Sequence, residues 1–272
     1  MSDFDYFMEN EDEILRLEVK TDLDNVKRQA LWAGLRPGMR VADLACGPGK
    51  TTHFFHDLVQ PGGAAVGIDG SAERIAHAQK THSFQGPAFF CRNLLEPLDD
   101  LGTFDFIWVR FFLEYHKSDA FQIVKNISRL LNPGGILCLV DLDYNCLSHY
   151  GIPERLQRTI LRVIHLLEKN ENFDSRVGIK LYSFLYDLGF ENINVMMEPH
   201  HLIYGKLGAV DEFNWTTKVE VAVKKFQFLL DEYENGYDEF YVEFKKAFSN
   251  PRRFTYTPVI CCRGGRSVSD DT

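Results

Sequence analysis

The chain has 272 residues, of which 45% are hydrophobic and 25% are charged, the composition of an ordinary globular protein with a sizeable core. Its formal net charge is −9 and its lysines and arginines do not cluster, which argues against a nucleic-acid partner. No apolar run is long enough to cross a membrane, and the acidic start "MSDFDYFMENEDE" lacks the apolar stretch of a secretory signal. The six cysteines have neither CxxC nor paired zinc spacing, so we expect reduced thiols, no metal and a cytoplasmic location.

Apolar runs and helical segments alternate through the first half of the chain. A helix is expected from Asn10 to Leu35, because Asn10 and Glu13 have capping-box spacing. Ser118 is expected to cap a later helix, and residues 132–135 ("NPGG") to form a turn. Apolar strands that alternate with helices indicate a mostly parallel sheet covered on both faces. The expected strands are 40–45, 64–69, 87–93, 104–110 and 136–142, and the other expected helices are 49–59 and 71–81.

The second half of the chain is richer in helix. Helices are expected at 152–170 and 177–188, a strand at 190–198, more helix across 206–250 and a last strand at 253–264. The segment 206–250 carries ten aromatic residues, and five of them share one helical face. This stripe either packs the segment against the core or lines an apolar substrate pocket. Its members are Tyr237, Phe240, Tyr241, Phe244 and Phe248.

A bare loop, "ACGPGKT" at 45–51, follows the first expected strand. In doubly wound sheets, loops at the carboxyl ends of the strands bind nucleotides. A dinucleotide site needs G-x-G-x-x-G, and this loop has no third glycine three residues on. Pro48 also lacks the N–H that a phosphate would require. The loop therefore favours a ligand with an amino-acid head group and a sugar over one with a pyrophosphate.

Polar side chains at three successive strand ends specify that ligand further. Asp43 is an acid inside a buried strand, a costly arrangement unless it faces a cation such as an α-ammonium. Asp69, at the end of the second strand, suits the two hydroxyls of a ribose. Asn93 and the backbone amide of Leu94 can read the edge of adenine, and Arg74 can lie across its face. Ammonium, ribose and adenine together describe S-adenosylmethionine.

Five stretches also fall in the order and spacing of one known family: "VADLACGPG", "VGIDGS", "CRNLLEPL", "FDFIWVRFFLEY" and "LNPGGILCLVD". Through them the chain resembles the class I S-adenosylmethionine-dependent methyltransferases over about residues 36–143. Its lead-in, "ILRL…GLRPGMRV", resembles bacterial members related to quinone-biosynthesis enzymes. "FLYDLGFENINV" and "TYTPVICCRG" resemble the antiparallel strand pair that closes the family's sheet. The resemblance implies an α/β fold: a Rossmann-like doubly wound sheet, mostly parallel with an antiparallel last strand, plus a helical lid.

The resemblance also implies roles for particular residues. Asp43 and Gly47 would meet the methionine end of the cofactor, and Val109 and Arg110 would flank it. In two departures from the family, Ala45 stands at the first glycine and Asn93 at the adenine-reading acid, and neither departure removes binding. The Asn/Asp-Pro-Pro-Tyr signature of enzymes that methylate base or amide nitrogens is missing from the fourth strand. The cofactor-binding residues predicted are Asp43, Ala45, Cys46, Gly47, Asp69, Gly70, Arg74, Asn93, Leu94, Val109 and Arg110.

The two large insertions follow strands five and six, whose loops leave the sheet at the cofactor edge in this fold. We therefore expect a lid of three segments over the cofactor. The expected division is an N-terminal lid segment at 1–35, a core at 36–143, a helical lid insertion at 144–174, core again at 175–205, a second lid insertion at 206–250, and the last core strand and tail at 251–272.

The expected activity is in-line transfer of a methyl group to a small, apolar or aromatic metabolite, with no nucleic-acid or membrane partner. A cofactor-binding sensor or scaffold without catalysis is the alternative, and the acceptor atom and the oligomeric state stay open. A base is needed only if the acceptor loses a proton. Catalytic candidates are Glu114, Tyr115, Asp143 and His149, with His116, Asp141 and Tyr144 also near the strand ends. His200 and His201 are expected to point apart on their strand and to share no metal ion.

Overall fold

The computed structural model describes residues 13–82, 84, 86–145, 147–224 and 230–268. An eight-stranded sheet runs through this part of the chain in the order β3-β2-β1-β4-β5-β8-β6, and β7 also pairs with β8. The strands from β1 to β5 are parallel, whereas β8 runs antiparallel to β5, β6 and β7. The predicted fold class is therefore confirmed. The strands are β1 (Arg40–Leu44), β2 (Ala64–Asp69), β3 (Ala88–Cys91), β4 (Phe104–Arg110), β5 (Leu131–Leu142), β6 (Ser148–Tyr150), β7 (Glu191–Tyr204) and β8 (Phe254–Gly265).

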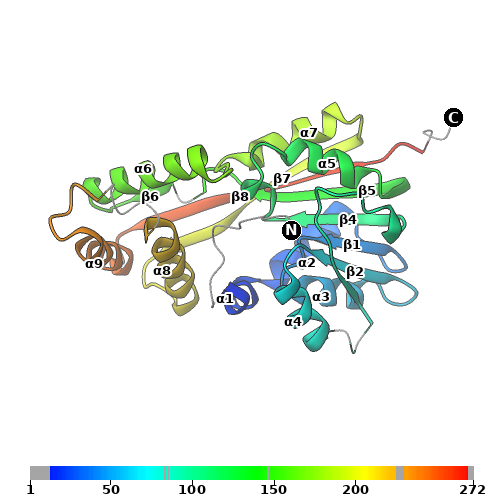
Figure 1. The fold of residues 1–272 in the computed structure, drawn as a ribbon, viewed down its shortest axis with the longest axis horizontal. Helices are drawn as coiled ribbons and strands as arrows, with labels where there is room; N and C mark the ends of the chain where they lie inside the picture. The colour runs from blue at the N-terminus through cyan, green and yellow to red at the C-terminus, as the bar shows by residue number, and fades with distance from the viewer. Residues whose placement is uncertain (1–12, 83, 85, 146, 225–229, 269–272) are drawn as a thin grey trace.

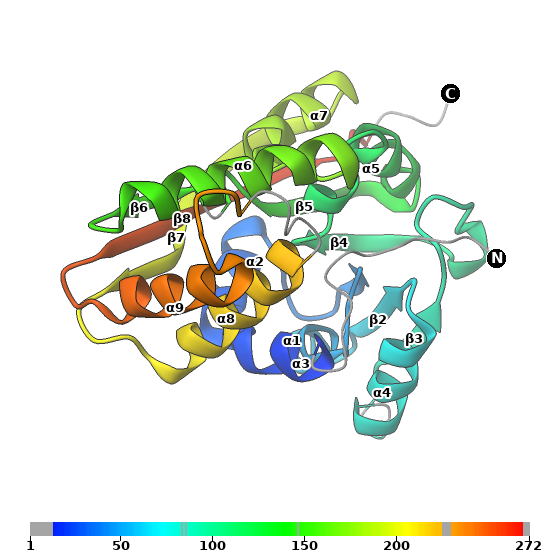
Figure 2. The same ribbon diagram turned by 60° about the vertical axis from the view of Figure 1, so that its left-hand side comes forward.

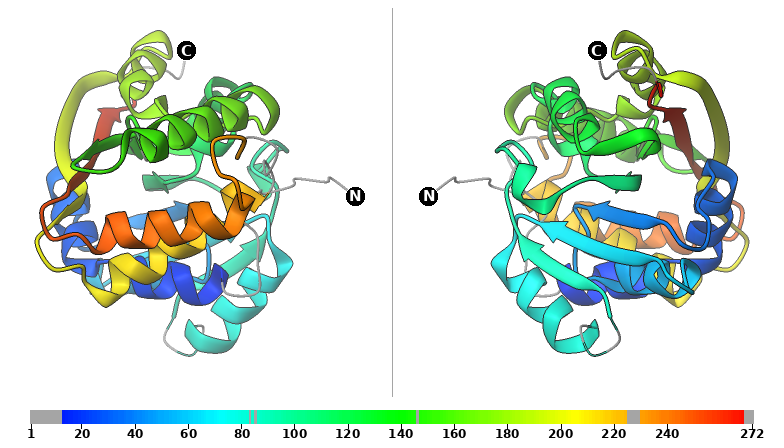
Figure 3. Two further views of the ribbon diagram at one scale, coloured as in Figure 1. Left: turned by 90° about the vertical axis from the view of Figure 1, so that its left-hand side faces the viewer. Right: turned by 90° about the vertical axis from the view of Figure 1, so that its right-hand side faces the viewer.

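Helices cover both faces of this sheet (Figures 1 and 3). Side chains alternate along β4, so that Phe106 and Trp108 pack with Phe55 in one apolar cluster, while Ile107 packs with Ile123 in another. The first cluster lies under α2 and α3, and the second under α5 and α7. The helices that cover the sheet are α2 (Leu23–Ala33), α3 (Lys50–Leu58), α4 (Ala72–His82), α5 (Ala120–Ser128) and α7 (Leu181–Asp187). Three short 3₁₀ turns accompany them: η2 (Asp99–Leu101), η3 (Leu113–Tyr115) and η4 (Val177–Lys180).

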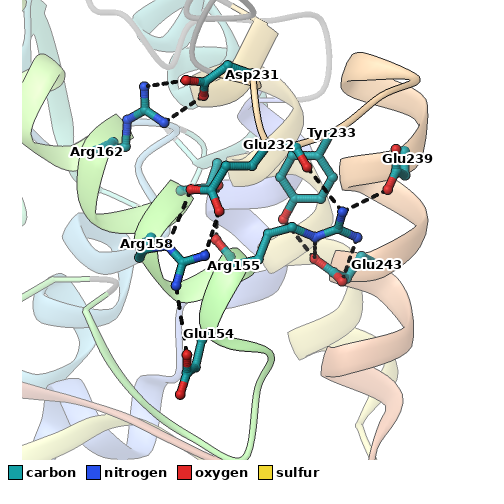
Figure 4. A network of polar contacts seen from close by, with 10 residues as sticks. Glu154, Arg155, Arg158, Arg162, Asp231, Glu232, Tyr233, Glu239 and Glu243 are labelled. Carbon is teal, nitrogen blue, oxygen red and sulfur yellow. Dashed lines mark hydrogen bonds and ion pairs between the residues drawn. The ribbon is translucent and has the colours of Figure 1, made fainter.

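Four further helices lie beyond the carboxyl ends of the parallel strands (Figures 1 and 2). They are α1 (Glu13–Lys20), α6 (Glu154–Asn170), α8 (Ala209–Lys224) and α9 (Gly236–Ser249), and we call them the lid. The last three share an apolar cluster of their own, which includes Leu167, Val219 and Phe240. Figure 4 shows a surface layer of ion pairs that joins α6 to the segment 231–243. In it, Arg155 bonds Glu239 and Glu243, each at 2.9 Å.

Two details of the helices differ from the sequence prediction. The helix expected from Asn10 to Leu35 is two helices, because the side chain of Asp22 accepts hydrogen bonds from Asp24 N and Asn25 N and so begins a new one. Asn10 itself lies outside the described residues. Ser118 does not cap α5: its hydroxyl donates to Asp119, and α5 begins at Ala120 with no side-chain cap.

Two strand details were also missed. The turn expected at 132–135 lies inside β5 as an irregularity, where the pairing with β4 shifts register between Phe104 and Phe106. Gly134 N–H donates to Arg266 O, and Arg266 N–H donates to Gly135 O, so backbone bonds hold this bulge against the end of the chain. The short strand β6 was not predicted at all. No helix in the described part of the chain combines the length and apolar character that a bilayer crossing requires.

Candidate active site

A cavity of about 230 Å³ opens at the carboxyl ends of β1, β2, β3 and β4. Parallel strands bring these ends to one edge, so that residues far apart in the sequence line a common space. All the predicted cofactor-binding residues except Val109 line it. Val109 packs instead into the apolar cluster beneath α5. The predicted residues that line the cavity are Asp43, Ala45, Cys46, Gly47, Asp69, Gly70, Arg74, Asn93, Leu94 and Arg110.

The loop after β1 has a backbone conformation that few residue types adopt. Gly47 has φ +57° and Gly49 has φ +92°. A Cβ on Gly49 would come within 2.8 Å of the ring of Phe89 and 2.7 Å of Ala78, so this glycine also allows α4 and β3 to pack against the loop. Ala45, which replaces the family's first glycine, is held at φ +58°, a strained value for a residue with a side chain. The methyl group is accommodated at the cavity wall.

Asp69 fastens this loop to the next strand end. Its Oδ2 accepts a hydrogen bond from Gly47 N at 2.8 Å, and its Oδ1 accepts one from Ser71 N at 2.9 Å. Arg74 Nη1 lies 3.6 Å from Oδ1. A carboxylate has about four acceptor positions, so lone pairs remain for a ligand in the cavity. Arg74 therefore forms an ion pair with Asp69 and also lines the wall of the cavity.

Asp43 is buried beneath the same cavity. Its Oδ2 accepts a hydrogen bond from Thr52 Oγ1 at 2.6 Å. Burial raises the pKa of Asp43 to about 7 against the opposing effect of this hydrogen bond, and the charge of Asp69 raises it further. Without a ligand, the charged form is thus poorly compensated, which suits a site for a cation.

The ends of β3 and β4 supply the remaining walls. Asn93 Oδ1 accepts from Leu95 N at 3.0 Å, which orients its amide, while Leu94 is buried against the core. The guanidinium carbon of Arg110 lies 4.1 Å from the ring centroid of Phe111, and burial lowers the pKa of Arg110 to about 10. Phe111 has φ +55°, so the chain turns sharply where β4 ends.

Other cavity residues were not predicted to bind the cofactor. Leu17, Lys20 and Thr21 line it from the end of α1, and Phe112 and His116 line it from the loop after β4. Burial lowers the pKa of His116 to about 4. The residues from α1 carry no sequence signal, because their position depends on how the lid packs. Lys50 anchors that helix end by donating from Nζ to Glu18 O at 2.6 Å.

Of the predicted catalytic residues, the structure places Tyr115 at the cavity. It lines the 230 Å³ cavity and also a second cavity of about 70 Å³ between α6 and α8. Glu114 is buried and lines neither: its Oε2 accepts from Asn145 Nδ2 at 2.7 Å, and its backbone N donates to Asp141. Burial raises the pKa of Asp141 well above its ordinary value.

The other two predicted catalytic residues lie outside both cavities. Asp143 faces Arg176, at 3.6 Å between Oδ1 and Nε. His149 lies on β6, where its Nδ1 is 2.9 Å from Thr255 Oγ1 and its ring packs edge-on against Trp215 and Phe248. Tyr144, also considered from the sequence, is exposed and packs on the guanidinium of Arg176.

The second cavity is lined almost wholly by apolar side chains. They come from α6, α8 and α9, with Phe173 from the segment after α6 and Tyr115 from η3. Phe240 lines this cavity, whereas Phe244 and Phe248 belong to the apolar interior of the lid. The lining residues are Tyr115, Asn145, Ile160, Val163, Ile164, Leu167, Phe173, Trp215, Lys218, Val219, Ala222, Val223 and Phe240.

His200 and His201 do not point apart, contrary to the sequence prediction. The pairing of β7 with β8 shifts register between Pro199 and His201, and the two ring centroids lie 4.3 Å from each other. A bulge thus removes the alternation that the prediction assumed. Among the described residues, no group of three or more histidines, cysteines or acids is placed to hold a metal ion.

Comparison with known proteins agrees with this geometry. Residues 42–137 match the family described as "Methyltransferase domain". An uncharacterized methyltransferase of Synechocystis is 36% identical over 110 residues, 40% of this chain and 49% of that protein. A demethylmenaquinone methyltransferase of Staphylococcus aureus is 31% identical over 116 residues, 42% of this chain and 47% of that protein. The chain thus spans about half the length of these relatives.

The fold is shared more widely. A phosphoethanolamine N-methyltransferase of Haemonchus contortus, solved with S-adenosylhomocysteine, superposes with a TM-score of 0.56 at 14% identity, over 93% of this chain and 57% of that one. At that identity the likeness concerns the fold alone. The family match over residues 42–137 identifies this part of the chain as a methyltransferase domain, and the superposition adds that the fold is shared.

Proposed function

We propose that this chain is an S-adenosylmethionine-dependent methyltransferase that acts on a small metabolite with an apolar or aromatic body. One observation carries the proposal: Asp43, Asp69, Asn93 and the glycine-containing loop after β1 all line a single cavity at the ends of four strands. The relatives include a demethylmenaquinone methyltransferase, of which the chain matches about half, and the name of that enzyme supports a small-molecule acceptor.

The residues present fit S-adenosylmethionine. Asp43, buried and poorly compensated, would hold the α-ammonium, and Asp69 would hold the ribose hydroxyls through its remaining lone pairs. Asn93 and the Leu94 amide would read adenine, and Arg74 would lie near its face. Gly47 and Ala45 would border the methionine end. The bound cofactor supplies an electrophilic methyl group on a cationic sulfur.

The contribution of the protein is to align the acceptor and exclude water. Because charge disperses in the transition state of a methyl transfer, alignment of the acceptor with the methyl group and exclusion of water supply most of the acceleration. Tyr115 lines both cavities, so it would contact both proposed ligands. We propose it as the positioning group of the reaction. Glu114 and Asn145 would fix the turn that carries Tyr115, through the bond between their side chains.

A sensor that binds the cofactor without catalysis is the alternative. The second cavity favours an enzyme, because a sensor needs no space for an acceptor next to the cofactor. The proposed division of labour places cofactor binding in 36–143, 175–205 and 251–272. The lid segments 1–35, 144–174 and 206–250 would then enclose the acceptor.

Turnover tests this proposal. The protein would be incubated with methyl-labelled S-adenosylmethionine and separate pools of phenols, quinols, amines, carboxylates, RNA and protein. Label is expected in a small-molecule pool and not in RNA or protein. Tight cofactor binding with no label in any pool would favour the sensor, and absence of cofactor binding would refute both functions.

A further inference from the structure

The second cavity contains one charged group within an apolar wall. Of the described residues that line it, Lys218 on α8 is the cation, and the ammonium lies 5.5 Å from the ring centroid of Trp215. Within the described part of the chain, no carboxylate lies within ion-pair distance of this ammonium. This half-buried ammonium can therefore pair with an anion that enters the cavity.

Two further cations line the first cavity, which shares Tyr115 with the second. Lys20 Nζ and the guanidinium carbon of Arg110 lie 5.4 Å and 4.1 Å from the ring centroid of Phe111. Arg16 is compensated, because its guanidinium forms an ion pair with buried Glu13 at 2.6 Å. Lys20 has no such partner among the described residues. Lys20 and Arg110 line the first cavity and Lys218 lines the second.

The nearby titratable groups reflect the same field. Burial, and after it the charges of Arg16 and Lys218, hold the pKa of Lys20 well below its ordinary value. Burial and the adjacent cations, Lys218 and Lys20 among them, likewise lower the pKa of His200 and His201. The two histidines are thus neutral near pH 7 and add no charge of their own. Glu13 and Glu114 act on the pKa of Lys20 in the opposite direction, and the Oε2 of Glu114 accepts a hydrogen bond from Asn145.

We propose that the second cavity binds an acceptor with one carboxylate, whose charge pairs with Lys218 while its apolar body lies between α6 and α8. This inference rests on the proposed function, since it names the acceptor class for that reaction. One cation in the cavity wall calls for one negative charge, and an ammonium donates well to a carboxylate. The apolar lining suits a hydrocarbon or aromatic body. An anion here also lies favourably toward the sulfonium of the cofactor.

Matched probes test the charge. Benzoate and benzamide have nearly the same shape, and so do hexanoate and hexanamide, but only the acids are anions at pH 7. The Kd of each would be measured by NMR titration of the full chain saturated with S-adenosylhomocysteine. We expect each acid to bind about 10- to 100-fold more tightly than its amide. Equal binding within the pairs, or no binding of any probe, would overturn the proposal.

Variants assign the effect to one residue. Lys218→Met keeps the length of the side chain and should abolish the preference for acids, whereas Lys218→Arg should keep it. Lys245→Met is the control, because Lys245 also lies over an aromatic ring, 5.4 Å from that of Tyr241, but lines neither of the two cavities. A preference that survives Lys218→Met would refute the assignment.

The affinity for S-adenosylhomocysteine, measured by calorimetry on every variant, separates this inference from the proposed function. If Lys218→Met keeps the affinity for S-adenosylhomocysteine but loses the preference for acids, the result supports both the proposed function and this inference. Failure of the wild type to bind the cofactor product, with the acid preference intact in the unloaded protein, would refute the methyltransferase but leave the anion site.

Discussion

The affinity for S-adenosylhomocysteine should depend on pH through Asp43. This carboxyl must be charged to hold the α-ammonium, yet burial raises its pKa to about 7 in the unliganded protein. Lowering the pH below 7 therefore protonates the group that the ligand needs. We expect binding to weaken as the pH falls and to release a proton from the protein near pH 7.

The size of the effect follows from the pKa. With a value of about 7, roughly one carboxyl in eleven is charged at pH 6 and ten in eleven at pH 8, so the Kd should rise about 10-fold from pH 8 to pH 6. The rise of the pKa from 3.8 to about 7 corresponds to about 4 kcal/mol for charging the buried group. Because the folded pKa lies above the unfolded one, this group's contribution to stability is complete below about pH 4 and is lost as the pH rises through 7. A ligand ammonium should offset part of that loss.

Calorimetry at pH 6, 7 and 8, in buffers of different ionisation enthalpy, measures both the Kd and the protons released. About half a proton should leave per ligand bound at pH 7. Asp43→Asn should remove the pH dependence while its amide oxygen still accepts from Thr52. Asp57→Asn, on the exposed face of α3, should leave it intact. An affinity that is constant from pH 6 to pH 8 in the wild type would refute the reasoning.

Three further substitutions test other parts of the structure. Asp69→Ala should weaken S-adenosylhomocysteine binding by roughly 1–3 kcal/mol, because it removes a charged acceptor and releases Gly47 N–H; an unchanged calorimetric Kd would remove the ribose assignment. His149→Ala should leave that Kd unchanged but lower stability to urea by about 1–3 kcal/mol, because the ring packs inside the lid; slower turnover at equal stability would instead restore it as a catalytic candidate. Arg155→Ala should lower the thermal midpoint less in high salt than in low salt, since its ion pairs are screened; the same decrease at every salt concentration would contradict an ionic role.

Much of the core could be predicted from local sequence. The strands β1, β2 and β4 are mostly apolar and buried, and Pro37-Gly38 and Pro61-Gly62 mark where the chain turns between elements. Once these strands are taken as parallel, their carboxyl ends must meet at one edge. The cavity lining by residues as distant as Asp43 and Asn93 follows from that topology.

The lid could not be predicted in the same way, because its geometry depends on tertiary packing. Lys20 and Lys218 are 198 positions apart, and nothing in the sequence of either helix indicates that the two ammonium groups lie near each other. His149 was expected near the strand ends, but pairing of β6 with β8 places it beside Thr255. His200 and His201 were assigned by strand alternation, which one bulge in β7 undoes. Each of these depends on contacts between distant segments.

A crystal structure of the complex with S-adenosylhomocysteine tests the central claim most directly. The account predicts adenine beside Asn93, ribose hydroxyls on Asp69 and the α-ammonium on Asp43, with the sulfur facing Tyr115. Density for the ligand at another place, or none at saturating concentration, would contradict it.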